Sequence, residues 1–362
     1  QNTGMEPVTT GTSAEKKGGI VYVYIDNTGG SFVATSNVHK IINGEIPAEL
    51  APWGVNDFTY DEAGTTITGL SAAGQAKIKN NAALMLPENG PTGEAITALG
   101  TGAAMKGIFM HSEDDKNYAP TSVMLPSTLK EIGNFAFAYN PMLDYETADM
   151  TAIALPNGLE KIGNMAFQNS TIESISMPDT VTSLGTAAFT NSCLKSVKLS
   201  KGLTEIPQSA FANAASDLTS SKMEIDTVVI PEGVTTIGRM AFSGARVKNL
   251  TLPSTLTEIG RDAFNNHQLT SLVIPENVTL IDRNAFRVLQ EGLGHNLTSL
   301  TLNEGLLTIE REAFAGNNLT EVDLPSTLES LDDEAFVNGA SGIVTLYTSN
   351  KEHVEKFNTA AA

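Results

Sequence analysis

Residues that could carry out chemistry are few and scattered in this chain. The five histidines are His39, His111, His267, His295 and His353, and none stands in the H-x-x-x-H or H-E-x-x-H spacing that brings two imidazoles to one metal ion. No G-x-S-x-G, Walker or G-x-G-x-x-G pattern occurs in the sequence. The sequence therefore predicts no catalytic residue, no metal and no cofactor, and we expect the protein not to be an enzyme.

Two other features are weaker candidates for chemistry. Cys193 is the single cysteine, has no neighbouring histidine and stands beside Leu194, which favours a buried apolar position over a nucleophile. Residues 112–117 (Ser-Glu-Asp-Asp-Lys-Asn) could offer carboxylates to calcium, but they lack the ligand spacing of an EF-hand. We interpret this segment as a solvated loop.

Composition narrows the range of partners. The 362 residues carry a formal net charge of −19, which disfavours nucleic acids and anionic membrane surfaces, because both need clustered Lys and Arg. No apolar run is long enough to span a bilayer. Because the chain begins at Gln1, we expect a mature or trimmed form from which a signal segment is absent.

The elements that must position any site belong to an internal repeat. Nine phenylalanines, each preceded by alanine, recur along the chain, and five of the eight intervals between them are 22 residues. They are Phe137, Phe167, Phe189, Phe211, Phe242, Phe264, Phe286, Phe314 and Phe336. A period this short predicts a solenoid, in which each unit stacks on its neighbours. We expect these rings to form a structural spine, and we expect binding rather than catalysis.

Each unit contains two extended segments. Leu269-Thr-Ser-Leu272-Val-Ile274 alternates apolar and polar residues, as a strand with one buried face does, and the proline that follows ends strand pairing. Leu256-Thr-Glu-Ile259 predicts a second, shorter piece, and the Ala-Phe step is expected on a short helical or 3₁₀ turn. Glycine follows the second segment in several units and predicts a turn with positive φ. These glycines are Gly133, Gly163, Gly238 and Gly260.

Three units are longer than the rest, and the extra residues always stand between the phenylalanine and the next strand. The insertions recur every third unit, so we expect them to line one edge of the array. Insertions in repeat proteins often mark the binding face, although a triplet duplication with inert loops is the alternative. The candidate binding edge consists of Tyr139, Met142, Leu143, Tyr145, Leu218, Arg287, Leu289 and His295.

The outward residues of the main strands form a second candidate surface. They are small and polar and include no aromatic residue, whereas protein hot spots favour Trp, Tyr and Arg. We therefore prefer the insertion edge as the binding site and keep the strand face as the second choice. The candidate concave face consists of Glu173, Lys195, Lys198, Asp226, Lys248, Asn249, Thr270 and Glu321.

Four regions follow from these patterns. Residues 1–55 lack the repeat, with a strand expected at 20–25 and a short helix at 38–42; residues 56–120 form an N-terminal cap with a degenerate first repeat, in which Ala104 replaces the phenylalanine. Residues 121–347 form the solenoid. Residues 348–362 form a C-terminal cap that includes a short amphipathic helix from Lys351 to Phe357.

The unit L-P-x-x-L-x-x-I-G-x-x-A-F followed by L-x-x-L-x-L-P resembles the BspA-like class of bacterial leucine-rich repeats. The resemblance covers roughly residues 86–347 and rests on many copies. It implies a right-handed leucine-rich-repeat solenoid of parallel β-strands with short helical or 3₁₀ turns, about nine repeats plus caps, preceded by a small N-terminal α+β segment. The short units are one residue shorter than the common family unit, and the third position after the phenylalanine holds Ser170, Ser192, His267 or Asn317 instead of a regular asparagine ladder.

Family members are typically secreted or surface-attached, and some are linked to adhesion. The resemblance thus implies a non-enzymatic, extracytoplasmic bacterial protein that binds a host or bacterial surface protein or glycan. The alternative is a structural spacer that presents another module and has no ligand of its own. A binder predicts an exposed apolar patch of more than roughly a few hundred Å², whereas a spacer predicts none.

Overall fold

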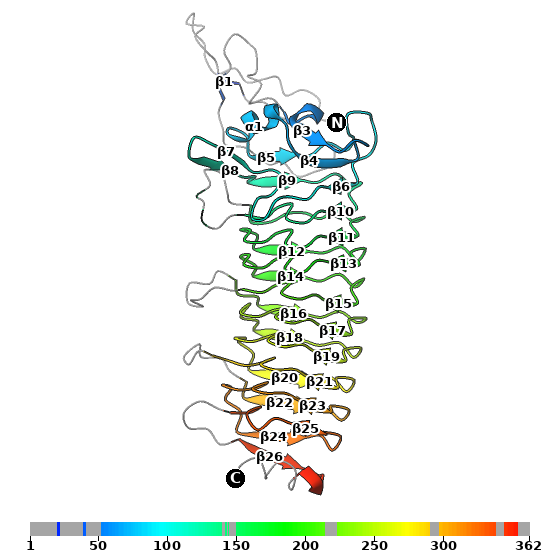
Figure 1. The fold of residues 1–362 in the computed structure, drawn as a ribbon, viewed down its shortest axis with the longest axis vertical. Helices are drawn as coiled ribbons and strands as arrows, with labels where there is room; N and C mark the ends of the chain where they lie inside the picture. Colours follow the sequence, from blue (N-terminus) through cyan, green and yellow to red (C-terminus); the bar gives the residue numbers. More distant parts are fainter. Residues whose placement is uncertain are drawn as a thin grey trace, which may run out of the picture.

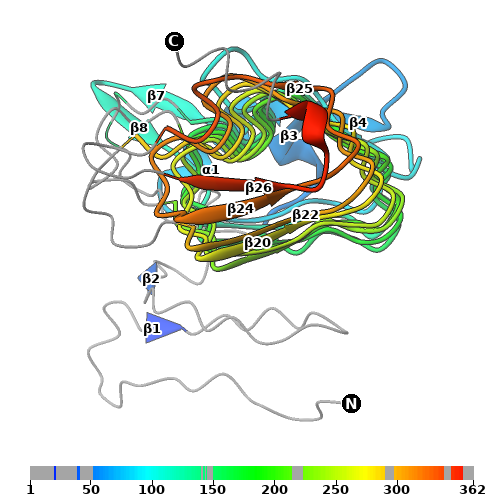
Figure 2. The ribbon, with the colours of Figure 1, turned by 90° about the horizontal axis from the view of Figure 1, so that it is seen from below.

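The computed structural model of the chain describes residues 20–21, 39–40, 52–139, 142, 144, 150–213, 223–289, 297–337 and 344–353. Over these residues the chain winds into a repeat solenoid whose coils stack in a straight column, with the N-terminal elements at one end (Figure 1). Each regular coil contributes two short strands and one Ala-Phe turn, on different sides of the column (Figure 2). Because the column is straight, the strand face expected to be concave is flat.

The first strand of each coil belongs to what we call the main face. These strands pair in parallel and in register, two at a time, as in β12 with β14 and β20 with β22. In the strands from β12 to β16 the middle side chain is buried and its two neighbours are exposed, which confirms the predicted alternation. The strands are β5 (Ala83–Met85), β9 (Ser122–Met124), β12 (Ser174–Ser176), β14 (Ser196–Lys198), β16 (Thr227–Val229), β18 (Asn249–Thr251), β20 (Ser271–Ile274), β22 (Ser299–Leu302), β24 (Glu321–Leu324) and β26 (Thr345–Thr348).

The second strand of each coil forms what we call the second face, made of two six-stranded sheets. The first sheet contains β3 (Phe58–Tyr60), β4 (Thr66–Leu70), β6 (Ala98–Leu99), β10 (Glu131–Ile132), β11 (Lys161–Ile162) and β13 (Ser183–Leu184). The second contains β15 (Glu205–Ile206), β17 (Thr236–Ile237), β19 (Glu258–Ile259), β21 (Leu280–Ile281), β23 (Thr308–Ile309) and β25 (Ser330–Leu331).

The break between the two sheets has a local cause. In other coils the residue after the second strand donates its N–H to the preceding coil, as Gly185 does to Ile162 and Gly238 to Ile206, at 2.8 and 2.7 Å. Pro207 occupies this position after β15 and has no N–H to donate to Leu184. The proline therefore separates the second face into an N-terminal and a C-terminal block.

The nine phenylalanine rings form one stack inside the column. Neighbouring ring centroids lie 4.9–5.5 Å apart with interplanar angles of 2–11°, and every ring is buried. The backbone N–H of each phenylalanine from Phe137 to Phe314 donates to the alanine carbonyl of the next coil at 2.7–2.8 Å. The ring spacing is therefore fixed by the same hydrogen bonds that hold the coils together.

The Ala-Phe turns contain a residue in the left-handed region that the sequence did not suggest. The residue two before the phenylalanine has φ between 52 and 59° in eight coils, although none of these residues is glycine. They are Phe135, Met165, Ala187, Ser209, Met240, Asp262, Asn284 and Glu312. In the first seven, the N–H of this residue donates to a carbonyl of the next coil at 2.8–3.0 Å. A helical or 3₁₀ turn, as predicted here, would point that N–H elsewhere, so the segment forms a hydrogen-bonded turn instead.

The glycines expected to have positive φ serve a different purpose. Gly133, Gly163, Gly238 and Gly260 are absent from the left-handed positions, so that prediction is wrong. A Cβ on Gly163 would lie 2.6 Å from the backbone N of Asn134 in the preceding coil, and one on Gly133 would lie 2.4 Å from the Gly100 carbonyl oxygen. These glycines are required because the coils approach each other too closely there for a side chain.

The N-terminal cap closes one end of the column. It contains the 3₁₀ turn η2 (Val55–Asp57), the antiparallel pair β3 and β4, and the helix α1 (Ala72–Ile78). Lys77 Nζ on α1 lies 2.5 Å from the Asp57 carboxylate, 3.1 Å from the Pro52 carbonyl oxygen and 5.3 Å from the Trp53 ring centroid, so the buried charges are paired. Phe109, not Ala104, takes the ring position of the first repeat and lies 5.7 Å from Phe137.

Two shorter segments complete the description. Strand β1 (Ile20–Val21) pairs antiparallel with β2 (His39–Lys40), so the short helix expected at 38–42 is wrong at residues 39–40. At the other end, β26 pairs with β24, and residues 351–353 are helical. The remainder of the helix expected from Lys351 to Phe357 lies outside the described residues.

Candidate functional site

The main face brings the predicted strand-face residues into a ladder along the column. Glu173, Lys195, Asp226, Lys248 and Thr270 each precede the main strand of successive coils, and charges of opposite sign alternate over the first four. Lys195 Nζ lies 2.7 Å from Glu173 Oε1, and Lys248 forms an ion pair with Glu224. Surface pairs of this kind contribute little stability, about 0–1 kcal/mol.

The remaining residues of this candidate face lie on the strands themselves. Asn249 donates its amide to the Asp226 carbonyl at 3.1 Å, which ties it to the preceding coil. Lys198 on β14 and Glu321 on β24 are exposed and lie at the two ends of the uncharged strands β16 to β22. The candidate face is therefore a row of paired charges beside a neutral centre, and it contains no convergent group of titratable side chains.

The residues of the candidate insertion edge differ in their exposure to solvent. Met142 and Leu289 are 87% and 56% exposed, whereas Tyr139 is 3% exposed and packs with Met110 and Ala119. Arg287 lies 2.8 Å from the Glu312 carboxylate and is only partly exposed. Tyr139 is therefore unavailable to a ligand. Leu143, Tyr145, Leu218 and His295 lie outside the described residues.

A hairpin that the sequence did not reveal adds to this edge. Residues 112–117, interpreted above as a solvated loop, form the tip of β7 (His111–Glu113) and β8 (Lys116–Tyr118), which projects from the side of the column (Figures 1 and 2). Asp114 and Asp115 adopt φ of 47 and 64° in the turn. Asn117 donates to the Asp144 carbonyl at 3.2 Å, so the hairpin contacts the first insertion.

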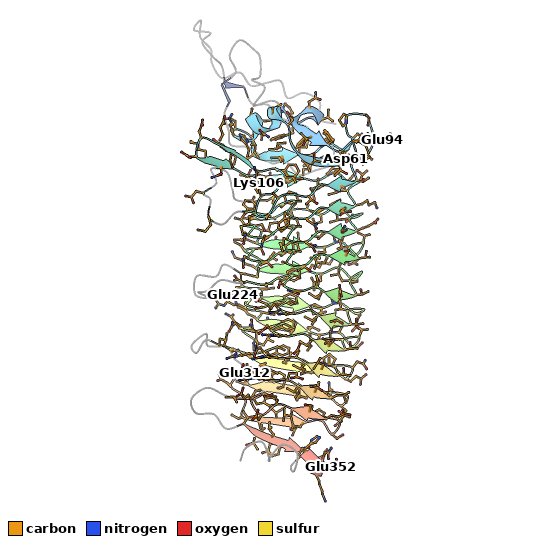
Figure 3. The ribbon with its side chains drawn as sticks, in the orientation of Figure 1. Asp61, Glu94, Lys106, Glu224, Glu312 and Glu352 are labelled. Atoms are coloured by element: carbon orange, nitrogen blue, oxygen red, sulfur yellow. The ribbon has the colours of Figure 1, made fainter. Side chains whose placement is uncertain are left out.

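The described Ala-Phe turns lie along one side of the column. Figure 3 shows Lys106, Glu224 and Glu312 along one side and Asp61 and Glu94 along the other. We call the side of the Ala-Phe turns the turn edge. It includes Met105, which precedes Phe109, and Val337, which follows Phe336.

The backbone conformation of one residue distinguishes the short from the long connections after the phenylalanine. Where the next strand begins at once, the second residue after the phenylalanine has φ between 56 and 76°, at Asn169, Asn191, Gly244, Asn266 and Gly316. Where an insertion follows, Tyr139, Asn213 and Val288 at the same position do not have positive φ. A left-handed residue turns the chain directly into the next strand, and Asn or Gly adopts this conformation most readily.

Carboxylates clamp the corners that follow the main strands. Glu232 accepts hydrogen bonds from the N–H and hydroxyl of Ser254 at 3.1 and 3.0 Å, and Glu304 accepts the same pair from Ser326 at 2.9 and 2.8 Å. These donors lower the pKa of both carboxyls below the ordinary value. The clamps link adjacent coils and belong to the scaffold.

The buried histidine His267 also belongs to the scaffold. Its Nδ1 accepts from the Leu269 N–H at 3.0 Å, and its Nε2–H donates to the Phe286 carbonyl at 3.2 Å. Burial lowers the pKa of His267 to about 4, against the smaller opposing effect of the Phe286 hydrogen bond. The ring is therefore neutral near pH 7 and positions the connection between Phe264 and the next strand.

Other titratable groups remain dispersed. Cys193 is partly exposed, contrary to the buried position expected for it. Burial, followed by the charges of Lys79 and Lys106, lowers the pKa of His111, which stacks on Tyr118 at 6.1 Å. Across the described ranges, no three His, Cys, Asp or Glu side chains are grouped so that they could hold a metal ion.

The fold and this surface define a class: a parallel β-solenoid built on stacked Ala-Phe turns, with a flat strand face and one irregular edge. Residues 116–226 and 219–342 match the family described as the BspA type leucine rich repeat region, in six copies. The chain therefore belongs to the BspA-type leucine-rich-repeat proteins. No curated protein matches the sequence.

Several solved structures are similar to this chain. A leucine-rich repeat protein from Bacteroides ovatus is 18% identical, with a TM-score of 0.45, over 82% of this chain and 90% of that one. A leucine rich cell surface protein from Faecalibacterium prausnitzii is 17% identical, with a TM-score of 0.34, over 85% and 96%. The pneumococcal vaccine antigen PcpA is 18% identical, with a TM-score of 0.33, over 82% and 91%. In the described part of the chain no helix has the length and apolar character needed to cross a membrane.

Proposed function

We propose that this protein is a non-enzymatic, extracytoplasmic binding module that attaches to a protein or glycan on a host or bacterial surface. Family membership supports the general class, because leucine-rich repeats commonly present surfaces for recognition rather than catalysis. The choice between a binder and an inert spacer rests on where this chain exposes its apolar side chains.

The distribution of exposed large apolar residues carries the proposal. Within the described residues they lie in strands of the main face or on the turn edge, and none lies in a strand of the second face. The main face holds Met124, Val229, Val273, Leu346 and Tyr347, and the turn edge holds Met105, Met142, Leu289 and Val337. A spacer has no reason to segregate them, whereas a binding module keeps apolar contacts on the surface that meets its ligand.

The second face supplies the contrast. Glu131, Lys161, Glu205 and Glu258 project from it, and Lys161 Nζ lies 2.7 Å from Glu131 Oε1. Its exposed charges favour solvation over burial in an interface. We therefore assign recognition to the main face and the turn edge together.

The test is binding of the purified chain to immobilised matrix proteins and surface glycans, repeated with the three insertions shortened to the length of the 22-residue units. In the shortened connections Tyr139 and Val288 are replaced by Asn and Asn213 is kept, so that all three match the short coils and the chain can turn directly into the next strand. Loss of binding with unchanged thermal unfolding would assign recognition to the turn edge, and unchanged binding would assign it to the main face. No binding by either form would overturn the proposal in favour of the spacer.

A further inference from the structure

The centre of the main face is an uncharged patch in a strongly acidic protein. Strands β16, β18, β20 and β22 present two outward columns of small side chains. These are Thr227, Asn249, Ser271 and Ser299 in one column, and Val229, Thr251, Val273 and Thr301 in the other. All eight are exposed, and none is charged or aromatic. We call these eight residues the neutral patch.

Charges border the patch without entering it. Lys198 precedes it along the column, and Glu321 and Asp323 follow it. Beside it, Lys248 is engaged by Glu224, and the exposed Asp226 carboxylate accepts a hydrogen bond from the Thr227 hydroxyl at 2.9 Å. In a chain with a net charge of −19, four successive coils without an outward charge on their strands favour a ligand that is itself uncharged.

Four of the five patch hydroxyls make no hydrogen bond to the described part of the protein, whereas that of Thr227 donates to the Asp226 carboxylate at 2.9 Å. Thr257 and Thr279 on the second face donate their hydroxyls to the carbonyls of Thr235 and Thr257 in the preceding coils, at 2.9 and 3.3 Å. By contrast, no protein hydrogen bond to the hydroxyls of Thr251, Ser271, Ser299 or Thr301 occurs within the described residues. Before β22 on the main face, Thr298 links coils in the same way, with its hydroxyl 3.2 Å from the Thr270 carbonyl, so the unused donors and acceptors are those of the strand residues themselves.

The chemistry of the patch defines the partner class. The strands lie about 4.8 Å apart within the pairs β16–β18 and β20–β22, and their outward hydroxyl groups stand beside the methyl groups of Val229, Thr251 and Val273. Sugar rings offer the complementary pair of features, which are hydroxyl groups and C–H faces. An extended β-linked hexose chain also advances per sugar by nearly the spacing between coils.

We propose that the neutral patch binds an uncharged, extended polysaccharide that lies along the solenoid axis, with about one sugar per coil over four coils. This inference rests on the proposed binding function and specifies its ligand. The hydrogen bonds come from the hydroxyls of Thr251, Ser271, Ser299 and Thr301, since the Asn249 amide already donates to the Asp226 carbonyl, and the exposed valines contact the C–H faces. Because the patch has no aromatic platform, each sugar contributes little, and affinity depends on the length of the chain.

The first measurement is affinity electrophoresis of the purified chain in gels that contain hydroxyethylcellulose, soluble mannan or, as an anionic counterpart, dextran sulfate. We expect retardation by at least one of the neutral polymers and none by dextran sulfate. Two variants place a charge in the patch, Thr251→Asp and Val273→Asp, and Ser330→Asp on the second face is the matched control because Ser330 is an exposed strand residue. Each patch variant should weaken binding at least tenfold while the control binds as the parent does.

The outcomes separate this inference from the function on which it rests. Retardation by neutral polymer that both patch variants lose, with thermal unfolding within about 2 °C of the parent, supports the polysaccharide; such a shift is the size expected for a surface substitution. No retardation, combined with binding to an immobilised matrix protein, overturns the polysaccharide and leaves the binding function in place. No binding to any probe overturns both. Retardation by neutral polymer that the patch variants retain overturns the assignment to this face.

Discussion

Truncation of one central ring tests whether the stacked phenylalanines hold the array together. Phe242 is 1% exposed and stacks on Phe211 and Phe264 at 4.9 and 5.2 Å, with interplanar angles of 10 and 3°. A Phe→Ala change in a core costs about 3–5 kcal/mol, depending on how far the surroundings collapse. Little collapse is possible here, because the N–H groups of Phe242 and Phe264 hold their coils at 2.7 and 2.8 Å from the next carbonyls. We therefore expect Phe242→Ala to cost about 4–5 kcal/mol, in the upper part of that range.

The end of the stack provides the control. Phe336 is 8% exposed and has a single ring neighbour in the described stack, Phe314 at 5.3 Å. One stacked pair contributes about 0.5–1.5 kcal/mol beyond area burial, so Phe336→Ala should cost less than Phe242→Ala by at least about 1 kcal/mol.

Urea unfolding measured with two probes gives the result. Far-ultraviolet circular dichroism reports on the strands, and the fluorescence of Trp53, which contacts Phe58 at 5.4 Å, reports on the distant N-terminal cap. Because neighbouring coils stabilise one another, Phe242→Ala should lower both midpoints. If Phe242→Ala unfolded at the parent's midpoint, or if Phe336→Ala were equally damaging, the stacked-spine reasoning would be refuted.

Three further predictions concern the backbone conformation of the turns, the titration of His267 and the break between the two sheets. Ala187→Gly should raise the free energy of unfolding by about 0.5–1 kcal/mol, because Ala187 is held at φ 55°. Ala188 does not have a left-handed conformation, so Ala188→Gly should lower the free energy of unfolding by a similar amount. Urea midpoints of the two variants test this, and shifts in the same direction would contradict the argument. The native pKa of His267 is about 4, below its ordinary 6.5, so unfolding takes up a proton between those pH values. The contribution of this group to stability therefore falls by about 3 kcal/mol as the pH drops from 6.5 to 4. His267→Asn should remove that part of the pH dependence of stability towards urea, and an unchanged pH profile would count against the argument. Pro207→Gly should supply the N–H that Leu184 lacks, and hydrogen exchange should show a protected amide at residue 207; rapid exchange there would show that the two blocks stay separate.

The sequence predicted the features that repeat at a fixed period. The ring stack, the two strands per coil and the alternation of buried and exposed residues all depend on local patterns that recur many times. The glycine prediction was wrong because a missing side chain has two possible causes, positive φ or close approach of another chain. At Gly163 the cause is the backbone of the preceding coil, which no single repeat reveals.

Features set by non-local contacts could not be predicted in this way. The left-handed residues at Phe135, Met165 and Glu312 share no side-chain chemistry, because the N–H bond to the next coil selects the backbone conformation in most of these turns. Tyr139 was predicted to be exposed, but Met110 and Ala119 cover it. The residue two after the phenylalanine is only a partial exception, because Asn169 and Gly244 precede short connections but Asn213 precedes a long one.

The two faces of this solenoid differ in how their hydroxyl groups contribute to stability. On the second face, the hydroxyls of Thr257 and Thr279 each join two coils, so substitution there changes both the surface and the scaffold. On the main face, Thr251 and Ser299 contribute outward groups that join nothing, and coil-to-coil stability comes instead from the buried rings and backbone. Patch side chains without such bonds can therefore be exchanged at little cost in stability, typically within about 0.5 kcal/mol, whereas Asn249, whose amide donates to the Asp226 carbonyl, cannot be exchanged so freely. Substitutions such as Thr251→Asp thus change the surface without changing the scaffold, as a test of ligand binding on this face requires.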